Sequence, residues 1–204
     1  MTVKIVRYTL HERIMHWLAG FTYLYLLISG LAFYATQLYW LATLLGGGAT
    51  ARFWHPWAGL AFTLVMLWMH AAWRRDMRIT EADRNWSREV RKYIENKDEE
   101  VPPADRFNAG QKQFYWIMLG GAVFLLLSGF VMWFPEYSPR SLRPVAILIH
   151  EVAALITIGA FIIHVYMGLF MVPGGFQAIV RGFVSPLWAK THHRLWYERF
   201  LSKE

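Results

Sequence analysis

A long uncharged stretch near the N-terminus restricts this chain more than any other feature. No Asp, Glu, Lys or Arg occurs from Ile14 to Ala51, and three further apolar stretches follow. A helix needs about 20 apolar residues to cross the hydrocarbon core of a bilayer, and a spanning segment must satisfy its own backbone hydrogen bonds. We therefore predict four membrane-spanning helices, which cover residues 14–36, 53–73, 113–134 and 144–172.

The composition agrees with a membrane protein and excludes several other classes. Hydrophobic residues make up 56% of the chain and charged residues 17%, too few to cover the surface of a soluble domain. The chain has no cysteine, which excludes disulfides, iron–sulfur clusters held by this chain and covalently attached c-type haem. The net charge of +7 comes from basic residues that flank the apolar stretches, so we expect contact with membrane lipid and not with nucleic acid.

Lysine and arginine are unequally distributed between the segments that connect the predicted spans. The N-terminal segment, the 74–112 loop and the tail together carry eighteen of them, and the segments on the other side carry three. Such basic segments stay in the cytoplasm. We therefore predict an all-α fold, a single-domain (1–204) integral four-helix bundle that crosses the bacterial cytoplasmic (inner) membrane with both termini cytoplasmic. The residues before the first span hold no apolar run followed by a small-residue cleavage site, so we expect no removable signal peptide.

Two polar segments are expected on the cytoplasmic side. The 74–112 loop carries too much charge to form a core of its own, and we expect it either to contact a partner or simply to connect two spans. The 177–204 tail is rich in tryptophan and basic residues, so we expect a segment that lies on the membrane surface.

Four histidines fall at two depths of the predicted spans. His150 and His164 share the fourth span, about 21 Å apart along its axis and about 40° apart around it, so they lie on one face. His16 begins the first span on the inner side, and His55 begins the second on the outer side. Neutral imidazole is a standard axial ligand of haem iron, and an ionisable side chain inside a membrane is a functional candidate.

Depth then pairs these histidines for two b-type haems. His55 and His150 would hold an outer haem. His16 and His164 would hold an inner one, and together the two haems would carry electrons across the bilayer. The competing interpretation is a set of interfacial histidines that only form hydrogen bonds with their neighbours.

Several other polar residues lie near these positions. His70 competes with His16 for the inner haem, and we interpret it as a packed histidine or a group that handles protons. Glu151 would orient a ligand, move protons or stay hydrated at the interface. Arg13 and Arg52 are candidates to contact haem propionates. Three histidines outside the spans are expected to contact solvent or lipid headgroups: His11, His192 and His193.

The turn before the third span offers hydrogen-bond donors on the cytoplasmic side. Asn108 and Gln111 have the spacing of a reciprocal helix cap. The free N–H groups and positive potential of a helix N-terminus also suit the carbonyl oxygens of a quinone. We therefore predict a quinone pocket formed by Asn108, Gly110, Gln111 and Lys112, at the depth of the inner haem.

At these residues the chain resembles the cytochrome b (gamma) subunits of respiratory membrane-bound formate dehydrogenases. In that family the haem ligands match the two histidine pairs proposed above, and the quinone site borders the same turn. Glu151 and His70 depart from the family pattern, because apolar residues are expected there. The matching residues run through nearly the whole chain: Val6–Thr9, Glu12–Ile14, His16-Trp17, Ala51-Arg52, His55-Pro56, Asn108, Gly110–Lys112, Leu148, His150, His164, Tyr166, Trp188–Lys190, His192-His193 and Trp196-Tyr197.

The resemblance implies partners and a direction for the electrons. It implies an iron–sulfur (beta) subunit with its own membrane anchor, which delivers electrons from a molybdenum- or tungsten-pterin catalytic (alpha) subunit. The electrons would pass from the outer to the inner haem and reduce ubiquinone or menaquinone on the cytoplasmic side. The chain would then be the quinone-reducing subunit of an oxidoreductase, and not the subunit that oxidises formate.

Two alternatives stay open at this point. The first is the dihaem cytochrome b of another respiratory complex, such as a nickel–iron hydrogenase or a thiosulfate reductase. The second is a haem-free membrane anchor or small transporter that uses its histidines for packing or proton relay, although no pair of broken helices indicates a transport site.

Overall fold

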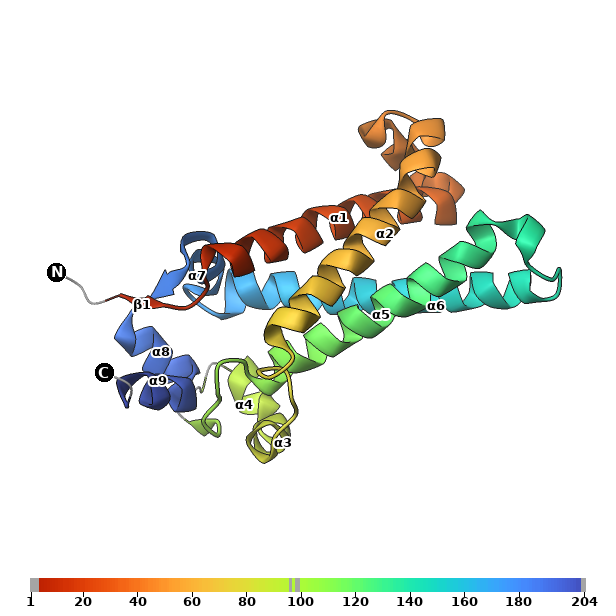
Figure 1. Cartoon of the computed structure of the whole chain (residues 1–204). Coiled ribbons are helices and arrows are strands. Elements are labelled where there is room, and N and C mark those ends of the chain that lie inside the picture. Colours follow the sequence, from red (N-terminus) through yellow and green to blue (C-terminus); the bar gives the residue numbers. More distant parts are fainter. Residues whose placement is uncertain (1–3, 96, 98–99, 203–204) are drawn as a thin grey trace. The chain divides into compact units, whose positions relative to one another are not determined.

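The computed structural model describes residues 4–95, 97 and 100–202. The chain divides into two compact units. Unit 1 consists of Met1–Arg13, Trp73–Trp116 and Phe161–Glu204, and unit 2 of Ile14–Ala72 and Ile117–Ala160. The chain is mostly helical, as predicted, and its four long helices are labelled in Figure 1: α1 (Leu10–Tyr34), α2 (Gly48–Trp73), α5 (Ala109–Trp133) and α6 (Leu142–Tyr166).

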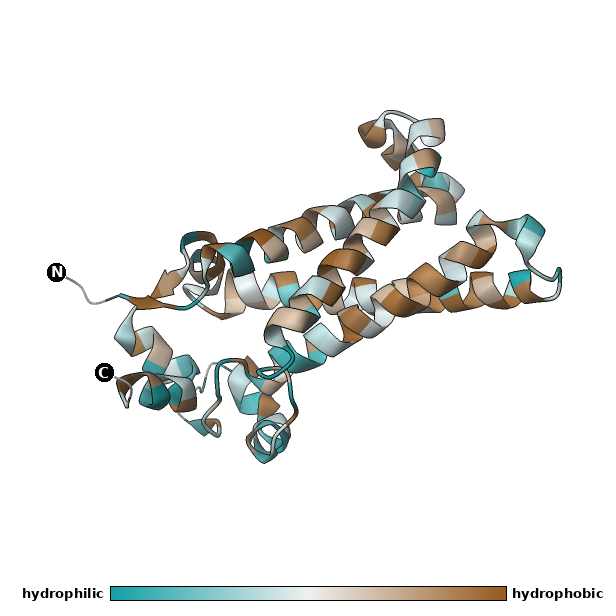
Figure 2. Cartoon of the chain, viewed as in Figure 1, coloured by the Kyte–Doolittle hydropathy of each residue, from teal (hydrophilic) through white to brown (hydrophobic). Residues whose placement is uncertain are grey.

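Three helices in the described part of the chain are long and apolar enough to cross a membrane. They are Leu10–Tyr34, Ala109–Trp133 and the segment Leu142–Met171, which adds a π-helical turn (η4, Met167–Met171) to α6. Helix α2 has 26 residues but falls short in apolarity, because it contains His55, His70, Pro56 and four tryptophans. Apolar colours predominate along the long helices in Figure 2. A span at α2 stays a prediction.

The long helices begin earlier than the apolar stretches indicate. Helix α1 starts at Leu10 because Thr9 and Glu12 form a reciprocal cap: the Thr9 N–H donates to Glu12 Oε2 at 2.8 Å, and the Glu12 N–H donates to Thr9 Oγ1 at 3.3 Å. Helix α2 starts at Gly48, directly after Gly46 and Gly47, whose positive φ angles end the preceding 3₁₀ helix η1 (Thr36–Leu45).

Unit 2 packs through small and hydroxyl-bearing residues. Ser29 and Thr157 are completely or almost completely buried, and Thr63 Oγ1 donates to the Gly59 carbonyl one turn earlier at 2.9 Å. A second small cluster joins η1 to the helix ends around it, through Ala32, Ala42 and Ala51. The short 3₁₀ helix η3 (Pro135–Tyr137) follows α5. Close backbone packing of this kind suits helices that have no hydrophobic driving force between them.

Unit 1 contains a short antiparallel sheet that the sequence analysis did not predict. Strand β1 (Ile5–Val6) pairs with β2 (Phe183–Val184), with Ile5 opposite Val184. These two residues form a core with Ala178 and Ala189, from α7 (Gly175–Arg181) and α8 (Pro186–His192). The tail, which ends in α9 (Arg194–Leu201), therefore folds together with the N-terminal segment.

The prediction that the 74–112 loop is too charged to form a core is wrong. It forms α3 (Glu81–Arg88) and α4 (Val90–Ile94), and Trp86 and Ala104 are buried against Ala109 with Tyr93 and Val101 around them. The charge is tolerated because the charged side chains of α3 lie largely on one face, which leaves Trp86 for the core. Residues 96, 98 and 99 of this loop lie outside the described residues.

Candidate functional site

His55 on α2 and His150 on α6 face each other inside unit 2. The centroids of their imidazole rings lie 6.4 Å apart, with an angle of 51° between the ring planes. Each ring meets a serine through Nδ1: His55 Nδ1 lies 2.7 Å from Ser29 Oγ on α1, and His150 Nδ1 lies 3.0 Å from Ser128 Oγ on α5. The four long helices thus each contribute one side chain to this arrangement.

The separation of the two rings fits one metal atom held between them. A metal–imidazole bond is about 2 Å long, and the ring adds about 1 Å from the nitrogen to its centroid, so two opposed ligands place their centroids about 6 Å apart. The contacts to Ser29 and Ser128 occupy Nδ1, which makes Nε2 the nitrogen available to a metal. Two opposed imidazoles can serve as the two axial ligands of a haem iron.

The other two predicted ligands belong to different units, so the inner pair stays a prediction from helix position. His16, in unit 2, meets the edge of Trp17 at 5.4 Å between ring centroids. His164, in unit 1, stacks face to face on Phe114, with the centroids 4.1 Å apart and the rings nearly parallel at 4°. The lone pair of Nε2 lies in the ring plane, so stacking on the ring face leaves that atom accessible to a metal.

Arg13 and Arg52 differ in what their guanidinium groups contact. Arg13 donates from Nε to the Ile179 carbonyl at 3.1 Å and from Nη2 to the Val180 carbonyl, so it caps the end of α7 within unit 1. Arg52 is exposed on α2, one turn before His55, and lines two adjoining hollows of unit 2 of about 370 and 680 Å³. Arg52 is therefore a better candidate than Arg13 to contact a bound anionic group.

His70 and Glu151 keep the ambiguity they have in the sequence. His70 is half-buried in the last turn of α2, and Glu151 is exposed on α6 beside His150. Glu151 is the sequence neighbour of His150 and interacts with it electrostatically. Their roles stay predictions.

The turn at Asn108 is built as a helix cap. The Asn108 N–H donates to Gln111 Oε1 at 3.0 Å, and the Gln111 N–H donates to Asn108 Oδ1 at 2.9 Å. Lys112 is 2% exposed, and its Nζ donates to Asp83 Oδ2 at 2.7 Å and to the Arg78 carbonyl at 3.0 Å. The cap uses the amide oxygens, so the NH₂ groups of Asn108 and Gln111 are not part of it, whereas Lys112 fixes the turn to α3.

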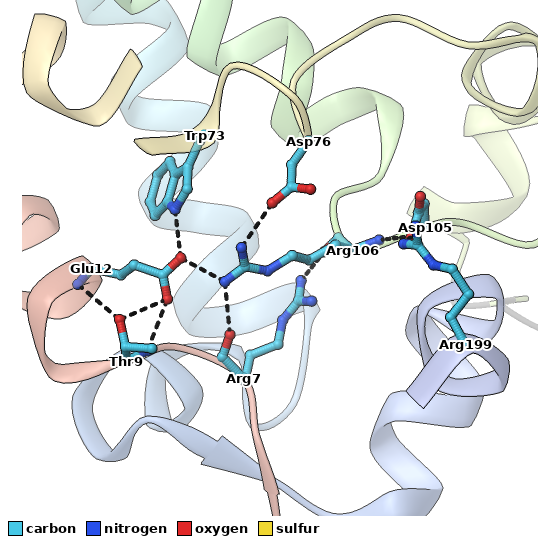
Figure 3. Close-up of polar contacts among 8 residues, drawn as sticks. All are labelled: Arg7, Thr9, Glu12, Trp73, Asp76, Asp105, Arg106 and Arg199. Atoms are coloured by element: carbon cyan, nitrogen blue, oxygen red, sulfur yellow. Dashed lines mark hydrogen bonds and ion pairs between the residues drawn. The ribbon is translucent and has the colours of Figure 1, made fainter. Parts of the chain in front are cut away.

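Sequence reasoning missed a network of charged groups in unit 1 (Figure 3). Glu12 Oε1 accepts from Trp73 Nε1 and from Arg106 Nη2, both at 2.6 Å, and Arg106 Nη1 donates to Asp76 at 2.8 Å. Burial lowers the pKa of Arg106, but the bonds to Asp76 and Glu12 outweigh it and raise that pKa overall. The spacing of Thr9 and Glu12, a capping-box pattern before an apolar run, was the available signal.

The same unit buries Arg7 and His193. Arg7 is 1% exposed, and its Nη2 lies 3.1 Å from His193 Nε2 and also donates to the Arg106 carbonyl. Four aromatic rings surround the guanidinium at 4.8 to 5.8 Å: Tyr8, Phe107, Trp188 and Trp196. Burial lowers the pKa of Arg7. The prediction that His193 contacts solvent or headgroups is wrong, because its side chain is buried between Arg7 and the Asp105 carbonyl.

Comparisons with known proteins identify the family of the chain. Residues 7–185 match the family model described as prokaryotic cytochrome b561. The chain is 36% identical over 197 residues to the formate dehydrogenase cytochrome b556(fdo) subunit of Escherichia coli, which covers 95% of this chain and 92% of that protein. It is 30% identical over 203 residues to the nitrate-inducible cytochrome b556(Fdn) subunit of the same organism (98% and 93% covered). It is 32% identical over 205 residues to the formate dehydrogenase cytochrome b556 subunit of Haemophilus influenzae (98% and 85% covered).

The family model covers most of the chain, and the relatives are matched over most of their length, so the family assignment is clear. With its apolar helices, the chain is a multi-pass membrane protein that belongs to the prokaryotic cytochrome b561 family, among the cytochrome b556 subunits of formate dehydrogenases.

Proposed function

We propose that this chain is the dihaem cytochrome b subunit of a formate dehydrogenase and transfers electrons from a partner subunit to membrane quinone. The observation that carries the proposal is the facing pair of imidazoles, His55 and His150, at 6.4 Å with both Nδ1 atoms occupied. A haem b held there would accept and release one electron at a time.

Different residues of the outer site would hold the iron and the propionates of such a haem. His55 and His150 would hold the iron through Nε2. Arg52 lines the adjoining hollows and would neutralise a propionate carboxylate, because a guanidinium binds carboxylates with two parallel hydrogen bonds. The apolar helices exclude water, which strengthens this interaction.

The inner site is assigned from helix position and from the surroundings of each ring. From their positions in the sequence, His16 and His164 would be the ligands at the other end of the spans, and Phe114 stacks on the ring of His164. Arg13 keeps its donors on α7, so we assign no propionate to it. Together the two sites provide a path for electrons through the thickness of the membrane.

Quinone is the substrate at the cytoplasmic side. The NH₂ groups of Asn108 and Gln111 would donate to the quinone carbonyl oxygens, and Gly110 lies between them in the turn. Lys112 supports the turn through Asp83. The electrons come from an iron–sulfur subunit anchored in the bacterial inner membrane, and ultimately from a molybdenum- or tungsten-pterin subunit that oxidises formate. Both termini of the chain lie in the cytoplasm.

A haem count on the complex, purified by a tag on this chain, tests the proposal. We expect two haems b per chain, and one after His55→Ala or His150→Ala, with the same loss for His16→Ala and His164→Ala. The matched control is His70→Ala, a histidine of the same helix as His55, which should keep both haems. One haem per chain in the unaltered complex, or two after His150→Ala, would refute the proposed ligand pairs.

The proteins that co-purify test the partner assignment separately. A pterin-containing subunit together with an iron–sulfur subunit supports formate dehydrogenase. A nickel–iron subunit would replace it with a hydrogenase, without changing the haem sites. A chain with no b-type absorbance after reduction would leave only an anchor or a transporter.

A further inference from the structure

Ser29 and Ser128 occupy matching positions beside the two imidazoles of unit 2. Each serine lies on the helix that precedes its histidine along the chain, α1 before α2 and α5 before α6 among the long helices. Each is buried, with 0% of Ser29 and 5% of Ser128 exposed. Each is followed by a glycine, Gly30 or Gly129.

The hydrogen bonds of each serine determine which nitrogen of its histidine carries the proton. Ser29 Oγ lies 2.7 Å from the Tyr25 carbonyl, and Ser128 Oγ lies 2.6 Å from the Phe124 carbonyl. A carbonyl oxygen only accepts, so the single hydroxyl hydrogen of each serine goes to the backbone. The hydroxyl oxygen must then accept from the imidazole, which places the proton on Nδ1 and the lone pair on Nε2.

The glycine beside each serine completes the position of the ring. A Cβ atom built on Gly30 would lie 3.8 Å from His55 Cε1, and one built on Gly129 would lie 3.5 Å from His150 Cε1. Cε1 is the ring atom between Nδ1 and Nε2, so any side chain longer than a methyl would push the ring away from the serine. The same serine–glycine pair therefore supports both rings at the same atoms.

The serine and glycine contacts described above belong to the outer pair of histidines. A histidine that donates its second N–H to an oxygen is a more basic ligand and stabilises the oxidised, more positive state of a metal. The two serines therefore act on the outer site.

Resting on the haem ligation proposed above, we propose that Ser29 and Ser128 are positioning residues of the outer haem. They hold His55 and His150 with Nε2 directed at the iron, and they set the reduction potential of that haem below the value it would have without the hydrogen bonds.

The test compares Ser29→Ala and Ser128→Ala in the purified complex with Thr22→Ala. Thr22 is the matched control, because its hydroxyl also donates to a backbone carbonyl of the same helix as Ser29, that of Leu18 at 2.7 Å. We expect each serine variant to raise the midpoint potential of one haem, to shift the largest g value of its low-spin signal, and to speed its release to a haem-scavenging protein about tenfold or more. Thr22→Ala should leave all three measurements unchanged.

The outcomes separate this inference from the haem assignment. If His55→Ala removes one haem but both serine variants match Thr22→Ala, the positioning role is wrong and the ligands stand. If His55→Ala removes no haem, the proposed function has failed first. Loss of both haems in both serine variants, with both retained in Thr22→Ala, would assign the serines to helix packing and overturn the inference.

Discussion

The two units of this chain satisfy buried polar groups in opposite ways. In unit 2 they are neutral: the hydroxyls of Ser29 and Ser128 return to the carbonyls of their own helices and at the same time contact imidazoles. In unit 1 most of them are charged, and Lys112 with Asp83 and Arg106 with Glu12 form buried or partly buried ion pairs. Hydrophilic colours are correspondingly frequent on α3 and α9 in Figure 2.

The difference follows from the cost of burying a charge. An uncompensated ion in an apolar interior costs several kcal/mol, whereas a hydroxyl that bonds to its own helix costs little. Neutral imidazoles held by serines can therefore stay in the apolar unit, where we propose that they hold a haem. The charged groups collect in the unit formed by the N-terminal segment, the loop and the tail, and they hold these three segments together.

The largest effect is expected where the charged unit is broken. Lys112→Met keeps most of the side-chain volume but leaves Asp83, which is buried, without its cation. Removal of one partner of a buried pair costs about 3 to 5 kcal/mol, and we expect a loss near the lower end because Thr80 still donates to Asp83 Oδ2 at 2.7 Å. Chemical denaturation of the detergent-purified protein measures this loss.

Two control variants show whether burial is the reason. Lys112→Met combined with Asp83→Asn should recover part of the loss, since no charge is then left unpaired. Arg194→Ala removes an exposed pair with Glu198 on α9 and should change little. Equal losses for Lys112→Met and Arg194→Ala would mean that the buried pair has no special weight.

In unit 2 the corresponding weak point is steric. A Cβ at Gly121 would overlap Thr157 Cγ2, so Gly121→Ala should destabilise the protein by about 1 to 3 kcal/mol through overpacking. A Cβ at the neighbouring Gly120 would have no atom within 4 Å, so Gly120→Ala should be neutral or stabilising by up to about 1 kcal/mol. Thermal unfolding of the two variants side by side measures the difference.

Thr157→Ser removes the overlapping methyl and should restore the stability of Gly121→Ala. The same unfolding experiment decides this point. If the Gly121→Ala protein stayed destabilised when Thr157→Ser was also present, the overlap with the Thr157 methyl would not be the cause of the destabilisation.

The parts of the fold that were predictable from sequence depend on local patterns. Apolar length indicates the bodies of α1, α5 and α6, and the depth of His55 and His150 indicates that their rings meet. The start of α1 was missed because its cap lies before the apolar stretch, in polar residues that a search for spans passes over. The short sheet was missed because Ile5 and Val184 lie at opposite ends of the chain, and two-residue strands carry no periodic signal.

At the candidate sites, sequence named residues more reliably than their roles. Ser29 and Ser128 are visible as serine–glycine pairs, but such pairs also let helices approach closely. Only the short distances from the serine Oγ atoms to Nδ1 of His55 and His150 indicate that these serines position histidines as well as allow close helix packing. Lys112 was assigned to quinone from its place beside Asn108, and its bond to Asp83 could not be foreseen because the partner lies on a helix that no apolar pattern marks.

The smallest expected effect is a pH dependence that should belong to unit 1. His193 Nδ1 donates to the Asp105 carbonyl at 2.7 Å, and Nε2 accepts from Arg7, so the folded state holds this ring neutral. Burial, and next the charge of Arg7, hold the pKa of His193 well below its ordinary value of 6.5. Below about pH 6.5 the unfolded chain therefore binds a proton that the folded chain does not. As the pH decreases below this value, the free energy of unfolding decreases by up to about 1.4 kcal/mol per pH unit.

His193→Gln should remove that part of the dependence, because an amide can donate to the Asp105 carbonyl and accept from Arg7 without titrating. Unfolding measured between about pH 5 and pH 8 should then show a flatter profile than the unaltered protein. If His193→Gln and the unaltered protein lost stability equally at low pH, the buried imidazole beside Arg7 would not be what makes unit 1 sensitive to acid.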